Sequence, residues 1–222
     1  MQRLYPLPAG PTTVREAYGV DRPRGNGDRP WIAVCMVASI DGSTVLRGAS
    51  AGLSSDADRE VLLTLRRLAD IIIVGAGTVR SEGYRKPTKA NQRIGVVSRT
   101  GHVDLSSELF TSGAGFLILP LDAPPTPADC VRAGVGEIDL GAALRLLPGD
   151  PDFVQAEGGP ALNGALAEAD LVDEMNITTS PQIVGGKGTR LIDAARPLHT
   201  AFRLAHVLED NGFVFSRYVR QD

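Results

Sequence analysis

The sequence predicts an α/β fold with a mostly parallel, mixed β-sheet and a C-terminal antiparallel hairpin. Short, continuous apolar runs are typical of strands that are buried on both faces, and helical patterns separate several of these runs. An Asn-Gly pair between the last two apolar segments is a two-residue hairpin signal. Because 222 residues with 43% hydrophobic content fit one core, we expect a single domain over residues 31–222.

Residues 1–30 are expected to form a loosely structured N-terminal arm. Five of the 15 prolines fall in this segment, together with the turn-like stretch "RGNGDRP". One short helical pattern runs from Thr13 to Tyr18.

A strand, a loop and a helix are predicted next. The run "WIAVCMVAS" from Trp31 indicates a buried strand, and "IDGS" ends it with a turn. In "SSDADREVLLTLRRLAD", Ser55 followed by Asp58 resembles a capping box, and apolar residues recur at helical spacing.

The same alternation continues along the chain and then gives way to antiparallel strands. Strands are expected at 71–74, 93–98, 115–120, 153–156 and 171–179, with a turn at "GAGT" (75–78), helices at "GAALRLLP" and "GGPALNGALAEAD", and a final hairpin around Asn211-Gly212. Pro160 takes the favoured first position of the second of these helices.

Charge and cysteine usage exclude several classes of protein. The net charge is −3 without a basic block, which argues against a nucleic-acid partner. Cys35 and Cys130 form no CxxC or His/Cys cluster, so no metal site is expected. The N-terminus lacks a signal-peptide pattern, and no apolar run approaches the roughly 20 residues that span a membrane, so we expect a cytoplasmic protein.

Three glycine-rich turns are candidate phosphate sites: "GAGT" at 75–78, "EGGP" at 157–160 and "VGGKGT" at 184–189. The first two follow predicted strands, and the second opens a helix, whose free N–H groups and positive dipole end suit a phosphate. Two such turns at one sheet edge could share a dinucleotide. The alternative is that these glycines only permit tight turns.

The dinucleotide fingerprint G-x-G-x-x-G is incomplete here, because Arg80 stands where its third glycine belongs. The strand that would carry a ribose-binding acid ends instead in Ser98-Arg99, and a hydroxyl with a guanidinium suits a 2′-phosphate. This favours NADP over NAD, unless Arg99 is simply an exposed strand-end residue. "VGGKGT" fails as a Walker A motif at Pro181 and Gly188.

Four motifs, "MVASIDG", "LRRLADIIIVGAGTVRSE", "AEGGPALNGAL" and "LVDEMNITTSPQIVGGKG", stand in one order across residues 36–188. Together they resemble the reductase domain of bacterial riboflavin biosynthesis, a relative of dihydrofolate reductase. The resemblance implies a dihydrofolate-reductase-like three-layer fold, usually dimeric, that binds NADPH and reduces the ribosyl group of 5-amino-6-ribosylaminouracil 5′-phosphate to ribityl. The H-x-E and P-C-x-x-C signature of the usual zinc-deaminase partner domain is absent, so the reductase alone is expected.

The resemblance also implies roles for residues at the matching positions. The implied cofactor-binding residues are Gly75, Gly77, Thr78, Val79, Ser98, Arg99, Gly158 and Gly159. The implied substrate-binding residues are Ser50, Arg66, Glu82 and Lys89, with Arg66 at the substrate phosphate. Glu157 and Asp41 are the candidate catalytic carboxyls, because reduction of a C=N bond needs an acid beside the reacting nitrogen.

The sequence departs from the family pattern on the substrate side. Gly52 stands where the family often has tryptophan, and "TVRSEGYRKPTK" replaces "TVxADxPxLTxR", with Lys89 standing for the final arginine. Two alternatives therefore remain open: a reductase of dihydrofolate or another pterin, and an NADPH-binding module without catalysis.

Overall fold

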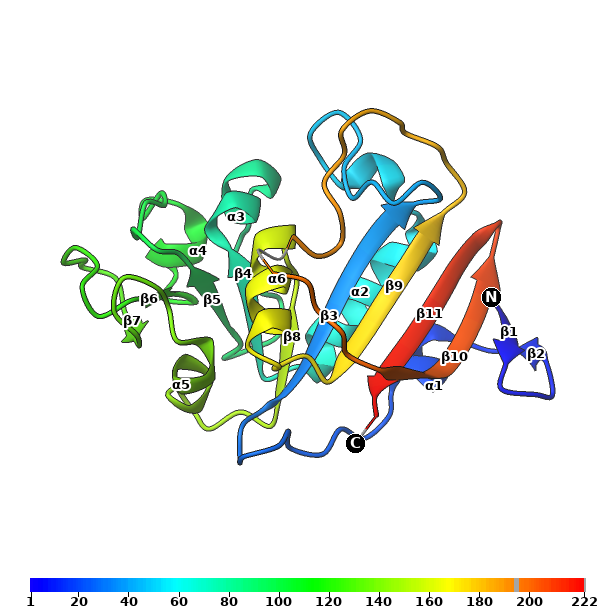
Figure 1. Ribbon diagram of the computed structural model, residues 1–222, viewed down its shortest axis with the longest axis horizontal. Coiled ribbons are helices and arrows are strands. Elements are labelled where there is room, and N and C mark those ends of the chain that lie inside the picture. The colour runs from blue at the N-terminus through cyan, green and yellow to red at the C-terminus, as the bar shows by residue number, and fades with distance from the viewer. Residues whose placement is uncertain (194–195, 222) are drawn as a thin grey trace.

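The computed structural model describes residues 1–193 and 196–221 and arranges them around one sheet (Figure 1). In this part of the chain the sheet has eleven strands, in the order β2-β1-β10-β11-β9-β3-β8-β4-β5-β6-β7. The strands are β1 (Gln2–Tyr5), β2 (Gly10–Pro11), β3 (Trp31–Ser39), β4 (Ile71–Gly75), β5 (Arg93–Val97), β6 (Gly115–Leu119), β7 (Cys130–Arg132), β8 (Phe153–Ala156), β9 (Glu174–Ser180), β10 (Phe202–Asp210) and β11 (Phe213–Arg220). The helices are α1 (Val14–Tyr18), α2 (Asp56–Leu68), α3 (Ala76–Glu82), α4 (Glu108–Thr111), α5 (Leu140–Arg145) and α6 (Pro160–Glu168), with a 3₁₀ helix η1 at Ala51–Leu53.

The mostly parallel, mixed sheet expected from the sequence is confirmed. Parallel pairs run from β9 through β3, β8, β4, β5 and β6 to β7, whereas β11 and β10 join antiparallel beyond β9. The final hairpin turns at Asn211-Gly212, and both residues have positive φ, as a type I′ turn requires.

Helices cover both faces of the sheet and give the fold its three layers (Figure 1). In β4, Ile71 and Ile73 face the core beneath α5 and α6, while Ile72 and Val74 face the core on the side of α4. The helices α1 and α2 cover the neighbouring part of this second face. No helix in the described residues is long and apolar enough to cross a membrane.

Residues 1–30 differ from the loosely structured arm that the prolines predicted. β1 pairs antiparallel with β10, and β2 pairs with β1. The helix α1 begins after Thr13, whose hydroxyl accepts from the Glu16 N–H at 3.2 Å while Glu16 accepts from the Thr13 N–H at 2.8 Å. Because α1 also buries Val14 and Tyr18 in the core with α2, the segment belongs to the fold.

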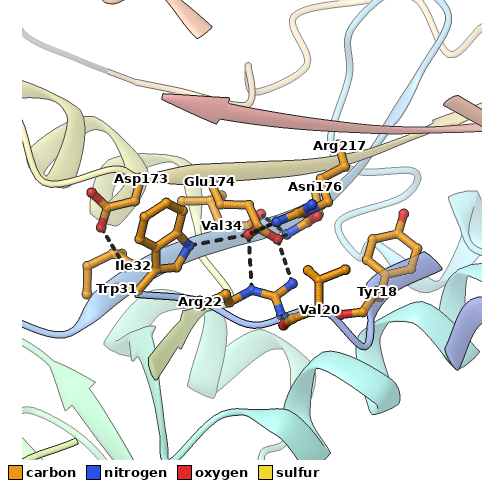
Figure 2. A network of polar contacts seen from close by, with 10 residues as sticks. All are labelled: Tyr18, Val20, Arg22, Trp31, Ile32, Val34, Asp173, Glu174, Asn176 and Arg217. Atoms are coloured by element: carbon orange, nitrogen blue, oxygen red, sulfur yellow. Dashed lines mark hydrogen bonds and ion pairs between the residues drawn. The ribbon is translucent and has the colours of Figure 1, made fainter. Parts of the chain in front are cut away.

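A buried polar network ties this N-terminal segment to the centre of the sheet (Figure 2). Glu174 on β9 accepts two hydrogen bonds from Arg22, at 2.8 and 3.0 Å, and one from Arg217 at 2.8 Å. Trp31 and Asn176 also donate to it. Burial alone would raise the pKa of Glu174, but the bonds and charges of Arg217 and Arg22 outweigh it and lower the pKa to about 2.

The helix α3 was not expected, since "GAGT" predicted only a turn. Gly77 and Thr78 have low helix propensity, and the helix has only seven residues, so its local pattern is weak. The helix forms because of its place in the fold. It starts directly at the end of β4 and ends at Gly83, whose φ of 65° suits a glycine. The short elements α4, η1 and β7 were likewise missed.

Candidate active site

A cavity of about 900 Å³ opens at the carboxyl edge of the parallel strands. It lies between α2 on one side and α3 with the start of α6 on the other, and β3 contributes residues 35–37 to it. In open α/β sheets this edge is where ligands bind. Most of the residues suggested by the sequence fall on or beside this cavity.

The glycine turns form one end of the cavity. Gly75, Gly77, Thr78 and Gly159 line it, and the Gly75 N–H donates to the Gly158 carbonyl at 2.7 Å. A Cβ on Gly159 would lie 2.8 Å from Thr78 Oγ1, so only glycine fits there without a shift. Thus the ends of β4 and β8 are brought together as the sequence suggested, with little side-chain bulk between them.

Ser98 and Arg99 stand at the same sheet edge but outside the cavity lining. β5 pairs with β4 so that Val97 is opposite Gly75, which places Ser98 beside the glycine end. Ser98 is buried and accepts from the Gly101 N–H at 3.0 Å, while the Arg99 side chain is exposed. Val79 points into the core behind α3 and does not line the cavity.

Glu157, Arg66 and Tyr84 form a tight cluster in the same cavity, next to the glycine turns, since Glu157 directly precedes Gly158. Arg66 donates to Glu157 through Nε at 2.7 Å and Nη2 at 2.6 Å, and the Tyr84 hydroxyl donates to Glu157 Oε2 at 2.6 Å. Burial raises the pKa of Tyr84 well above its usual value, and the Glu157 charge raises it further. Tyr84 therefore stays protonated and acts as a hydrogen-bond donor.

Ser50 and Glu82, which the resemblance assigns to the substrate, lie in contact with each other. The Ser50 hydroxyl donates to Glu82 Oε1 at 2.8 Å, and its backbone N–H donates to the same oxygen at 3.2 Å. Both residues line the cavity. The contact joins the loop before η1 to the C-terminal end of α3.

Asp41 has a structural position outside the cavity lining. It accepts from the Ser39 hydroxyl at 2.5 Å and from the backbone N–H groups of Val184 and Gly185 at 3.1 and 2.7 Å. These bonds, led by that from Ser39, lower the pKa of Asp41 to about 2. Asp41 therefore stays ionised near neutral pH and holds the "VGGKGT" loop against the end of β3, which is a poor arrangement for donating a proton.

Lys89 also lies outside the cavity lining, although the resemblance put it at the substrate. Its Nζ donates to the Ala69 carbonyl at 2.7 Å, and the Gln92 side chain donates to the Ala69 and Arg66 carbonyls. These bonds satisfy carbonyls at the C-terminal end of α2. In the segment "GYRKPTK", Arg85 and Lys86 line the cavity and Lys89 does not.

Among the cavity residues that the sequence reasoning missed are Tyr84, Arg59, Arg85 and Lys86. Three of them are in "EGYRK", so the departure from the family pattern was itself the available signal. Arg59 lies on α2 nearly two turns before Arg66, and that helical spacing puts both on one face.

Comparison with known proteins identifies relatives of this chain. The family model of the RibD C-terminal domain matches residues 30–214. The chain belongs to this family. A member from Methanothermobacter thermautotrophicus, named 2,5-diamino-6-ribosylamino-4(3H)-pyrimidinone 5′-phosphate reductase, is 28% identical over 74% of this chain and 83% of its own length. The resemblance drawn from the four sequence motifs is confirmed.

Solved structures agree on the fold. A pyrimidine reductase-like protein from Corynebacterium diphtheriae matches with a TM-score of 0.80 and 22% identity, covering 96% of this chain and 100% of that one. Dihydrofolate reductase from Enterococcus faecalis, complexed with NADP(H), matches with a TM-score of 0.51 and 13% identity over 86% of this chain and 97% of that one. The RibD-family chain thus has the dihydrofolate-reductase-like fold.

Proposed function

We propose that the protein is an NADPH-dependent oxidoreductase of riboflavin biosynthesis that reduces the ribosyl group of 5-amino-6-ribosylaminouracil 5′-phosphate to a ribityl group. One observation carries the proposal: the glycine turns and the cluster of Glu157, Arg66 and Tyr84 line one cavity. Hydride transfer requires donor and acceptor carbons in contact, which a continuous cavity allows. The name of the Methanothermobacter relative supports a ribosylamino-pyrimidine 5′-phosphate as the substrate class.

The glycine end fits the pyrophosphate of a dinucleotide. Gly159 precedes α6 without a side-chain cap, which leaves N–H groups of that helix for phosphate oxygens. Gly75, Gly77 and Thr78 offer a second surface opposite it, and a Cβ at Gly77 would meet only the Arg80 side chain, at 3.9 Å. These residues, with Gly158 behind them and Val79 supporting α3, would hold the cofactor.

The preference for NADPH rests on Ser98 and Arg99. Arg99 is exposed at the end of β5 and makes no ion pair within the described part of the chain. A guanidinium beside a hydroxyl matches a phosphate monoester, and the sequence directly after β5, Ser98-Arg99-Thr100, contains no acid that could accept from a ribose hydroxyl. We assign the 2′-phosphate of NADPH to the site formed by Ser98 and Arg99.

Bound NADPH supplies a hydride from its nicotinamide ring, and the protein must stabilise the acceptor. Opening of the glycosylamine gives a C=N bond that accepts hydride at C1′ most readily when the nitrogen is protonated and positively charged. Glu157 accepts three hydrogen bonds, which is the arrangement of an ionised carboxylate. Its negative charge would stabilise that nitrogen, with Arg66 holding the carboxylate in place, while Ser50 and Glu82 orient the substrate.

The homodimeric state implied by the resemblance is also part of the proposal. A second hollow, of about 420 Å³, is lined mainly by apolar side chains, among them Met175 and Ile177 of β9 and Phe202 of β10. Covering this surface with a second copy would remove apolar area from water. Light scattering of the purified protein should give the mass of a dimer, and a monomer at all concentrations would contradict this assignment.

Parallel assays of NADPH oxidation test the proposed activity. The protein is supplied with the ribosylamino-pyrimidine phosphate in one series and with dihydrofolate in the other. We expect oxidation with the first substrate. Turnover of dihydrofolate alone would favour the pterin reductase alternative, and tight NADPH binding without turnover of either would favour a non-catalytic module.

A further inference from the structure

The charge of Arg66 is already balanced by Glu157. Both oxygens of the carboxylate accept from this guanidinium, and the Glu157 side chain is only 3% exposed. A substrate phosphate placed against Arg66 would put further negative charge beside a buried carboxylate, and like charges repel strongly where water is excluded. Arg66 is therefore a poor sole partner for the phosphate.

Three other cations line the same cavity and have no such partner. Arg59 projects from α2, and Arg85 and Lys86 follow Tyr84 in the segment after α3. All three side chains are exposed, and within the described residues none makes a side-chain hydrogen bond or ion pair. Their charges are free to bind an anion.

Most of the acidic residues near these three cations already accept hydrogen bonds from other residues. Asp58 accepts from the Ser54 hydroxyl at 2.5 Å, and Glu82 accepts from Ser50. Asp56 is exposed in the first turn of α2, where the helix dipole stabilises its charge. Arg59 lies seven residues before Arg66, about 10 Å along the helix axis at 1.5 Å per residue, so its charge is well separated from the Glu157 pair.

We infer that Arg59, Arg85 and Lys86 bind the phosphate of the substrate, while Arg66 positions Glu157. The inference rests on the proposed function for its substrate and deepens it by naming the phosphate site. Guanidinium and ammonium groups at a cavity wall are the usual chemistry of phosphate recognition. Lys89, which caps α2, takes no part.

Calorimetry with ribose 5-phosphate, on the NADPH-loaded protein, tests the phosphate site without requiring turnover. The variants are Arg59→Ala, Arg85→Ala and Lys86→Ala, singly and combined, with Arg67→Ala as the control, since Arg67 is on the same helix outside the cavity lining. Each single variant should weaken binding about tenfold, as loss of a charged hydrogen bond does, and the control should not. Retained binding in the triple variant would overturn the inference.

Kinetics separate this inference from the proposed function. With the pyrimidine substrate, the triple variant should raise KM, leave kcat close to wild type, and lose the advantage of the phosphorylated substrate over its dephosphorylated form. If the wild type turns over the pyrimidine and the triple variant keeps its KM, the phosphate site is wrong and the function stands. If the wild type binds ribose 5-phosphate through these cations but reduces no pyrimidine, the site stands and the function is wrong.

Discussion

Arg66 and Glu157 form a bidentate ion pair in the wall of the cavity, with Nε–Oε1 at 2.7 Å and Nη2–Oε2 at 2.6 Å. The arginine comes from α2, and the glutamate follows β8. The Arg66 side chain is 31% exposed and that of Glu157 is 3% exposed. More of the arginine than of the carboxylate is therefore exposed to solvent, although both residues line the cavity.

Replacing Glu157 should abolish most of the activity. Glu157→Gln keeps the shape but removes the charge that we assign to the reacting nitrogen, so kcat should fall at least about a hundredfold. NADPH affinity, measured by fluorescence, should not change. Tyr84→Phe, which removes one hydrogen bond from the same carboxylate, is the matched control and should cost about tenfold or less. Wild-type turnover in Glu157→Gln would exclude this role.

Gly159→Ala should impair cofactor binding. The added Cβ would lie 2.8 Å from Thr78 Oγ1 and would narrow the glycine end of the cavity. We expect the KM for NADPH to rise about tenfold, in line with the cost of overpacking. Gly10→Ala is the control, because a Cβ there meets nothing within 4 Å. If both variants have the wild-type KM, the cofactor lies elsewhere.

Arg99→Ala should reduce the preference for NADPH over NADH. Loss of a charged contact to the 2′-phosphate should raise the KM for NADPH about tenfold and leave that for NADH unchanged. The comparison variant is Arg145→Ala, which removes an exposed arginine from α5. An equal loss with both cofactors would mean that Arg99 acts on structure and not on the phosphate.

Acidification should destabilise the protein through His206. Burial, followed by the Arg217 charge, lowers the pKa of His206 from 6.5 to about 4. Between these values the unfolded chain binds a proton that the folded chain does not, so the free energy of unfolding should fall by about 3 kcal/mol as the pH drops from 6.5 to 4. Urea unfolding across this range measures the slope. His206→Gln should flatten it, and an unchanged slope in that variant would assign the effect to other groups.

The central strands β3 to β6 and the strands β8 to β11 could be predicted because their signals are local. Apolar runs such as that at 31–39 and the Asn211-Gly212 pair carry enough information within a few residues. The helix α3 could not, since Gly77 and Thr78 weaken its pattern and its position after β4 decides its formation.

Long-range pairing explains the remaining differences. The prolines of residues 1–30 indicated a loose arm, but Arg22 pairs with Glu174, and no local pattern reveals a partner 152 positions away. Likewise, alignment to the family motif put Lys89 at the substrate, whereas the chain turns so that Arg85 and Lys86 line the cavity. The spacing of a motif predicts which residue types are present, but the fold determines which of these residues lie close together.

Transfer of deuterium from NADPH labelled at the nicotinamide C4 tests the central claim most directly. The labelled cofactor is incubated with the protein and the ribosylamino-pyrimidine phosphate, and the product is analysed by NMR. We expect one deuterium at C1′ of the ribityl chain, with Glu157→Gln slowing its appearance. A product without deuterium at C1′, or consumption of the label only when dihydrofolate is supplied, would contradict the proposed reaction.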